Sequence, residues 1–332
     1  MIIVIGNAKE PYPCYGALDL SVLLKELGYE TQVLLTKGLI DLSHLRANLI
    51  VGINTPPSYY NITQKYMIWL QDDCLWTKTD TVYDNWMFGY TVDKYPNEFR
   101  CPMLIPEAFL DNEDWKPEFD FVSIMNKGES LSEQLKFINA PQLEREFNRP
   151  MVDWGAFSEW CDSNPVISKF LSELPEMDRH LVKRYVLFHN VNEGLLRQQT
   201  VKWIDELGLS RRIEGLGWTT FAKRSQHITI YNTARVGLSV NGWLGEHHRD
   251  NEIQALGLPC VRRGLSYTEG RLGNRKKFKE QQRLWFADLI DSGIHDKKVT
   301  EMPPVSSWLG TPWTYNDKET LLKAFLAASE RG

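Results

Sequence analysis

The stretch RVGLSVNGWLGEHHRDNEIQALGLPCV, residues 235–261, decides the fold of the second half of the chain. Near its beginning, the mainly apolar residues 236–240 predict a buried strand, and the segment that ends in Gly-Leu-Pro predicts a helix. The loop between them delivers Arg249, and Glu252 follows one helical turn later. A guanidinium and a helix N-terminus both favour phosphate, and a carboxylate accepts ribose hydroxyls. The pattern indicates a nucleotide ligand; a solvated Arg–Glu pair is the alternative.

The N-terminal half has the pattern of a doubly wound parallel sheet. An apolar run at 2–5 is followed by a helical pattern at 17–28, and then by a second strand pattern at 30–35. Further apolar runs at 48–53 and 66–70 predict two more strands. Continuous apolar runs are typical of strands covered on both faces, so we expect ligands at the carboxyl ends of the strands.

The polar stretch at 111–120 predicts a connection between two domains. We expect two Rossmann-like domains, residues 1–115 and 116–315, and a closing helix at 316–332. A segment rich in helix formers and broken by prolines, about 129–184, predicts a helical insertion in the second domain. The expected elements around it are strands in 119–125, 184–190 and 212–218 and a helix at about 195–207.

Composition restricts the class of protein. The chain has 332 residues, 42% hydrophobic and 24% charged, and it contains no apolar run long enough to span a membrane. The N-terminus enters a strand at once, which leaves no room for a signal peptide and predicts a cytoplasmic protein. Five scattered cysteines without a C-x-x-C pattern indicate neither a disulfide framework nor a zinc site.

Positive charge is concentrated in one segment of this acidic chain. The net charge is −5, whereas residues 262–283 hold eight basic and two acidic residues, a local charge of +6. Clustered cations attract the phosphates of nucleic acid, and a solvated helix face is the equally weighted alternative. The candidate DNA-binding residues are Arg271, Arg275, Lys276, Lys277 and Lys279.

The sequence Arg249-Asp250-Asn251-Glu252, followed by Gly257-Leu258-Pro259, resembles the donor-site pattern of GT-B glycosyltransferases. The resemblance is to the CgeB-like enzymes and, more distantly, to the phage β-glucosyltransferase that modifies hydroxymethylcytosine in DNA. It implies two Rossmann-like domains that face a central cleft, the first on the acceptor side and the second binding a nucleotide sugar. In this resemblance Glu252 binds the ribose, and Arg249 lies near the diphosphate.

Further positions match the same pattern. The resemblance places Arg197 beside the diphosphate, where with Arg249 it would form a two-arginine clamp that replaces a metal ion. The other implied donor-binding residues are Gly215, Gly217, Trp218 and Asn241. Candidate sugar or phosphate contacts are His247, His248 and Asn192. No metal-binding motif is present, so we expect no metal and no cofactor beyond the donor.

Asp72 and Asp73 follow the strand pattern at 66–70 and are the candidate catalytic residues. The resemblance to the phage enzyme implies that Asp72 deprotonates the acceptor hydroxyl, and a helix-capping role is the alternative. Retaining relatives carry a second Glu eight residues before the ribose Glu, where this chain has Leu244. We therefore expect inversion at the sugar carbon.

The sequence thus predicts a metal-independent glycosyltransferase with a nucleotide-sugar donor, expected to be a UDP-sugar. The acceptor hydroxyl belongs either to a hydroxymethylated base in double-stranded DNA or to a glycan, a protein or a small molecule. A phage-encoded enzyme would work in the host cytoplasm. Two other functions stay open: a catalytically silent GT-B-like module that binds a nucleotide sugar or nucleic acid, and a nucleotide-sugar epimerase. Nothing in the sequence indicates an oligomeric state.

Overall fold

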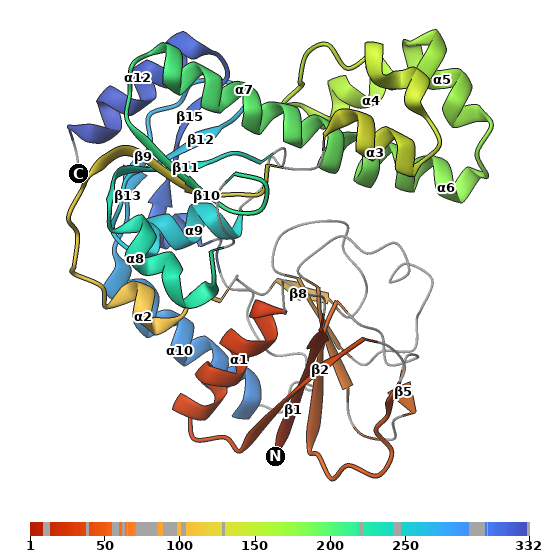
Figure 1. The fold of residues 1–332 in the computed structure, drawn as a ribbon. Helices are drawn as coiled ribbons and strands as arrows, with labels where there is room; N and C mark the ends of the chain where they lie inside the picture. The colour runs from red at the N-terminus through yellow and green to blue at the C-terminus, as the bar shows by residue number, and fades with distance from the viewer. Residues whose placement is uncertain are drawn as a thin grey trace. The chain divides into compact units, whose positions relative to one another are not determined.

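The computed structural model describes residues 1–8, 14–37, 40–54, 60–61, 64, 66–70, 85–88, 98–100, 104–127, 130–218, 222–241, 247–291, 303 and 305–330. The chain forms two compact α/β units (Figure 1). Unit 1 comprises Met1–Asp111 and Asn274–Leu309, and unit 2 comprises Asn112–Gly273 and Gly310–Gly332. Residues 274–309, which we expected in the second domain, therefore belong to the first unit.

Unit 1 is built on a parallel sheet with the strand order β2-β1-β4-β6-β7-β8. Its strands are β1 (Ile2–Asn7), β2 (Thr31–Thr36), β4 (Leu49–Ile53), β6 (Tyr66–Leu70), β7 (Asn85–Phe88) and β8 (Glu98–Arg100). A short parallel pair, β3 (Ile40–Asp41) and β5 (Tyr60–Asn61), accompanies the sheet. Every residue of β4 is buried, as its continuous apolar run predicts.

Helices from two parts of the chain complete unit 1. The first part contributes α1 (Tyr15–Glu26) and α2 (Glu107–Leu110), and residues 274–309 contribute α10 (Arg275–Asp291) and α11 (Ser306–Leu309). On α10, Phe286 packs against Trp69 of β6 with 6.1 Å between ring centroids. Gln282 of α10 accepts from the backbone N–H of Ile105 and donates to its carbonyl, at 3.1 and 3.0 Å. These contacts place α10 in unit 1.

Unit 2 contains a second parallel sheet, with the strand order β10-β9-β11-β12-β15. Its strands are β9 (Phe119–Ile124), β10 (Arg211–Glu214), β11 (Ala234–Ser239), β12 (Cys260–Arg263) and β15 (Trp313–Tyr315). An antiparallel pair, β13 (Arg271–Leu272) and β14 (Gly310–Thr311), belongs to the same unit. The helices next to the sheet are α7 (Glu193–Glu206), α8 (His227–Tyr231), α9 (His248–Ala255) and α12 (Lys318–Ser329).

A glycine sets the distance between α9 and the sheet. A Cβ added to Gly237 of β11 would lie 2.3 Å from Cγ2 of Ile253 on α9. The strand and the helix that residues 235–261 predict are confirmed, because β11 and α9 lie in this stretch. The predicted closing helix is α12, which Asp317 caps by accepting from the backbone N–H of Thr320.

Unit 2 also carries the predicted helical segment with a core of its own. It consists of α3 (Leu131–Phe137), η3 (Pro141–Arg145), α4 (Trp154–Ser163), α5 (Pro165–Ser172), α6 (Glu176–Leu181) and the π-helix η4 (Val182–Asn192). Figure 1 shows α7 leading from this helical segment to the sheet. Our prediction of a strand at 184–190 was wrong, since η4 occupies these residues. A short apolar run fits a buried helix as well as a strand, and here Leu187 and Phe188 pack into the helical core.

Candidate functional site

The predicted donor residues that the structure describes lie around the carboxyl ends of the strands in unit 2. Arg197, in the second turn of α7, donates from Nη1 to the carbonyl of Asn126, just after β9, at 2.9 Å. Its Nε donates to the carbonyl of Val240, just after β11, at 3.3 Å. In a doubly wound sheet ligands bind at this edge, so the position of Arg197 is that expected of a ligand-binding residue.

Arg197 is itself held by a buried acid. Its Nη2 forms an ion pair with Glu193, which is 6% exposed. The Arg197 side chain retains 19% exposure. Three nitrogens of its guanidinium group therefore bond to the protein, and these bonds join α7 to the ends of two strands.

Glu252 is the centre of a cluster of charged and polar groups. Its carboxylate is buried, with 1% of the side chain exposed. Arg224 of η5 (Arg224–Gln226) donates from Nη1 to Oε1, and Arg249 donates from Nη1 to Oε2 at 2.8 Å. His248 Nε2 lies 3.0 Å from Oε1. Both oxygens of Glu252 are thus engaged by side chains of the same unit.

His227 on α8 completes this cluster as a neutral imidazole. Its Nδ1 lies 2.9 Å from Nη1 of Arg249 and 3.4 Å from Nη1 of Arg224. Burial, followed by the charges of Arg249 and Arg224, lowers the pKa of His227 to about 2. Because the ring also has a backbone hydrogen bond with Ala222, we infer that Nε2 carries the proton and that Nδ1 accepts from the guanidinium groups.

The two histidines before Arg249 have different positions. His247 caps α9, where its Nδ1 accepts from the backbone N–H of Arg249 at 3.2 Å. Burial, His248 and then the guanidinium groups of Arg262, Arg249 and Arg197 lower the pKa of His247 well below its ordinary value. The pKa of His248 is lowered by desolvation and then by Arg249 and Arg224. Neutral imidazoles therefore lie among the arginines.

A second ion pair lies beside the first turn of α9. Arg262 of β12 contacts Oδ2 of Asp250 at 3.1 Å through Nη1 and donates from Nη2 to Oδ1 of Asn241 at 3.2 Å. Asn241 is 1% exposed and donates to Oγ of Ser239 at 3.1 Å. The amide of Asn241 therefore links β11 to β12 through Arg262.

The predicted glycine turn follows β10. Gly215 has φ +129°, and a Cβ there would lie 2.3 Å from the carbonyl oxygen of Met125. Gly217 has φ +84°. The backbone N–H of Trp218 donates to the carbonyl of Gly215 at 3.1 Å, and Lys127 Nζ lies 5.3 Å from the Trp218 ring centroid. The turn thus requires its glycines and brings an indole beside a lysine at the end of β9.

Asn192 has a role within the protein fold. It is 1% exposed, and its amide forms one hydrogen bond with the N–H and one with the carbonyl of Met151, each 2.7 Å. The structure thus uses this candidate sugar contact to hold the chain of the helical segment. Asp72 and Asp73 lie outside the described residues.

The basic segment 262–283 is divided between the two units. Arg262 is paired as above, and Arg263 is 3% exposed, with its guanidinium 4.5 Å from the Trp203 ring centroid. Arg271 lies on β13 of unit 2, whereas Arg275, Lys276, Lys277 and Lys279 lie on α10 of unit 1. Part of the +6 charge therefore serves internal contacts.

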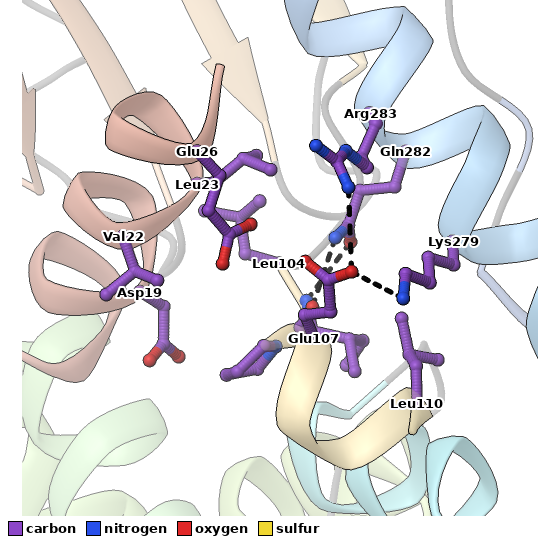
Figure 2. A pocket seen from close by; sticks show the side chains of 12 residues that line it. Asp19, Val22, Leu23, Glu26, Leu104, Glu107, Leu110, Lys279, Gln282 and Arg283 are labelled. Atoms are coloured by element: carbon purple, nitrogen blue, oxygen red, sulfur yellow. Dashed lines mark hydrogen bonds and ion pairs between the residues drawn. The ribbon is translucent and has the colours of Figure 1, made fainter. Parts of the chain in front are cut away.

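Lys279 lines a small pocket in unit 1 (Figure 2). Figure 2 shows its ion pair with Glu107, which Arg283 also contacts at 3.5 Å. Lys279 Nζ lies 2.9 Å from Asp111 as well. Hydrogen bonds to Glu107 and Asp111 raise the pKa of Lys279. On the other wall, desolvation and a hydrogen bond with Glu107 raise the pKa of Glu26.

Arg224, His227 and Arg262 are the residues of this site that the sequence pattern missed. Arg224 lies 28 positions before its partner Glu252, and no local motif joins them. A signal for Arg262 was present, because a charged residue in a largely buried strand requires a partner.

The described residues contain no group of His, Cys, Asp or Glu side chains able to hold a metal ion. Among the helices described, none is both long and apolar enough to cross a membrane. Comparison with protein-family models and with curated proteins finds no match to the chain.

Proposed function

We propose that the chain is a glycosyltransferase of the GT-B type, which moves a sugar from a nucleotide sugar to a hydroxyl acceptor. Two parallel α/β units support this proposal, because each half of a GT-B enzyme is a Rossmann-like domain. The observation that carries it is the convergence of Arg197 and Arg249. Arg197 of α7 donates to the carbonyl of Val240, just after β11, and Arg249 lies in the first turn of α9, the helix that follows β11.

The proposed chemistry depends on the charge of the leaving group. When the sugar leaves, negative charge develops on the nucleotide diphosphate, and guanidinium groups placed beforehand stabilise that charge. In this proposal they do so in place of a divalent cation. Asp72 or Asp73 would take the proton of the acceptor hydroxyl, and attack from the face opposite the diphosphate would invert the sugar carbon.

The proposal leaves two classes of acceptor. A hydroxymethylated base in double-stranded DNA would use the basic residues that remain exposed, including Arg271, Lys276 and Lys277. A glycan, a protein or a small molecule would not need them. The internal ion pairs of Arg262 and Lys279 reduce the charge available to DNA.

Calorimetric titration of the full chain with UDP, GDP, ADP and their sugars tests the donor assignment. We expect one nucleotide sugar to bind and to be hydrolysed slowly, with loss of turnover in Arg249→Ala. Arg235→Ala is the matched control, because Arg235 lies at the start of β11 and is 55% exposed. Binding without hydrolysis or transfer would favour a silent module, and interconversion of two sugars would favour an epimerase. Absence of binding by every nucleotide would contradict the proposal.

A further inference from the structure

Glu252 lies beneath the two arginines that it binds. Its side chain is 1% exposed, whereas those of Arg224 and Arg249 are 15% and 23% exposed. A carboxylate that accepts ribose hydroxyls has to be reached by the ribose. Here a ligand that approaches from solvent meets the guanidinium groups before it meets Glu252.

The two guanidinium groups are oriented by a pair of acceptors. Nη1 of Arg249 bonds to both Glu252 Oε2 and His227 Nδ1, at 2.8 and 2.9 Å. Nη1 of Arg224 has the same two partners, Glu252 Oε1 and His227 Nδ1. Both acceptors are 1% exposed, so neither can be replaced by water without opening the structure. The shared acceptors fix the two guanidinium groups relative to each other.

The charge of this cluster suits an anion. Among the described residues named here, two guanidinium cations and one carboxylate sum to one positive charge, and a neutral His227 adds none. A guanidinium binds phosphate oxygens through a planar set of N–H donors, and two such groups held together match the two phosphates of a diphosphate. The sequence resemblance placed Arg197 and Arg249 beside the diphosphate and did not include Arg224.

We propose that Glu252 and His227 are positioning residues that hold Arg224 and Arg249 as a binding site for the diphosphate of the donor. This inference rests on the proposed function for the identity of the donor. It gives Glu252 a role different from ribose binding, and it adds Arg224 to the donor site. Arg197, which bonds to the strand ends and to Glu193, then borders the diphosphate site.

The two roles of Glu252 predict opposite results with inorganic pyrophosphate, which has no ribose. If Glu252 bound only ribose, Glu252→Gln would leave pyrophosphate affinity unchanged or increase it, because a negative charge near the anion is removed. If Glu252 positions the arginines, the same substitution weakens pyrophosphate binding. The sign of the change therefore separates the two roles.

The experiment is calorimetric titration of the full chain with inorganic pyrophosphate. We expect binding to weaken about tenfold or more in Arg224→Ala and Arg249→Ala, the loss of a charge-assisted hydrogen bond. It should weaken in Glu252→Gln and remain unchanged in the control Arg235→Ala. Millimolar guanidinium should restore binding in Arg224→Ala, which a general loss of structure would not permit. Arg224→Lys, which keeps the charge and loses the planar fork, is the second variant if Glu252→Gln does not fold, and it should also bind more weakly.

Undiminished pyrophosphate affinity in Glu252→Gln or Arg224→Ala, or no binding by the wild type, would overturn the inference. Failure of the proposed function has a different signature: pyrophosphate binds through both arginines, and no nucleotide sugar binds or reacts. The converse result, nucleotide-sugar turnover with pyrophosphate affinity independent of Arg224, would retain the function and reject this site.

Discussion

Arg224 and Glu252 form a buried ion pair although 28 positions separate them in the sequence. One residue belongs to the short helix η5 before α8, and the other to α9, so the pair joins two segments on the same edge of unit 2. Because Arg249 and His248 also contact the carboxylate, the pair is one part of a network. Loss of Glu252 therefore removes the common partner of Arg224, Arg249 and His248, whereas loss of Arg224 leaves the other two contacts in place.

We expect Glu252→Ala to lower the free energy of unfolding by about 3–5 kcal/mol, since two guanidinium groups lose their common anion. Arg224→Ala should have a smaller effect, because Arg249 and His248 still bind the carboxylate. Urea denaturation of both single variants and the double variant measures the coupling between them. The exposed pair Arg235–Asp120, whose nitrogen and oxygen lie 3.4 Å apart, is the control and should contribute about 1 kcal/mol or less. Equal effects for Glu252→Ala and Arg224→Ala would contradict this network.

His227 makes unit 2 sensitive to acid. Its folded-state pKa is lowered to about 2 from an ordinary 6.5, so below pH 6.5 the unfolded chain takes up a proton that the folded chain does not. The stabilisation is complete above pH 6.5 and falls by about 1.4 kcal/mol per pH unit as the pH decreases further. We expect His227→Gln to remove this contribution while it keeps an acceptor for the arginines.

Urea denaturation between about pH 7.5 and pH 4.5 measures the contribution of His227 to the unfolding free energy. Histidine titration dominates in roughly this range. The difference in unfolding free energy between His227→Gln and the wild type should shift in favour of the variant as the pH falls. His44→Gln, at an exposed position of unit 1, is the matched control. Parallel pH profiles for the wild type and His227→Gln would contradict a neutral, buried His227.

Gly237 fixes the position of α9, and with it Arg249 and Glu252. Gly237→Ala would place a Cβ 2.3 Å from Cγ2 of Ile253, a contact that requires the Ile253 side chain or its helix to shift. We expect a loss of about 1–3 kcal/mol in unfolding free energy, with weaker nucleotide binding. Replacing Ile253 by Ala in the same chain should restore part of the binding.

Gly194→Ala on α7 is the control for Gly237→Ala. Its Cβ would lie 3.4 Å from the carbonyl of Lys127, an ordinary contact, so this substitution should be neutral or stabilise the helix by up to about 1 kcal/mol. If Gly237→Ala bound nucleotides as the wild type does, the close approach of α9 to β11 would have no part in forming the site.

Local pattern predicted much of the fold, and it failed where distant contacts decide. The run at 236–240 predicted β11 because an apolar stretch before a polar loop has few other solutions. The run at 184–190 became a π-helix, since its apolar residues pack into the core of the helical segment. Helix α10 belongs to unit 1, which its residues Phe286 and Gln282 contact. No sequence feature between 262 and 283 indicates that the chain rejoins the first unit there.

In the candidate site, too, the sequence revealed the residues that are close along the chain and missed those that only the fold brings together. Arg249 and Glu252 were found because they are one helical turn apart, a spacing that a sequence reveals directly. Arg224 and His227 lie between β10 and β11, whereas α9 follows β11, so only the packing around the parallel sheet brings them together. The burial of Glu252 is likewise a tertiary property, and it is this property that changes the role inferred for the carboxylate.

DNA as the acceptor would have to bind the basic side chains that remain exposed. Arg271, Lys276 and Lys277 are exposed, whereas Lys279 is held by Glu107 and Asp111. If DNA is the acceptor, replacing these three exposed residues by Glu should abolish DNA association. The salt dependence of the wild type should have a slope of about −0.9 per phosphate neutralised. Lys279→Ala should instead destabilise unit 1 and change DNA affinity little.

Filter binding at several salt concentrations measures the DNA affinity and its dependence on salt. Calorimetry with the nucleotide checks that the donor site is intact. Undiminished modification of DNA by the triple variant would show that these cations do not contact the acceptor. If the wild type shows no salt-dependent binding to DNA, the acceptor is a glycan, a protein or a small molecule.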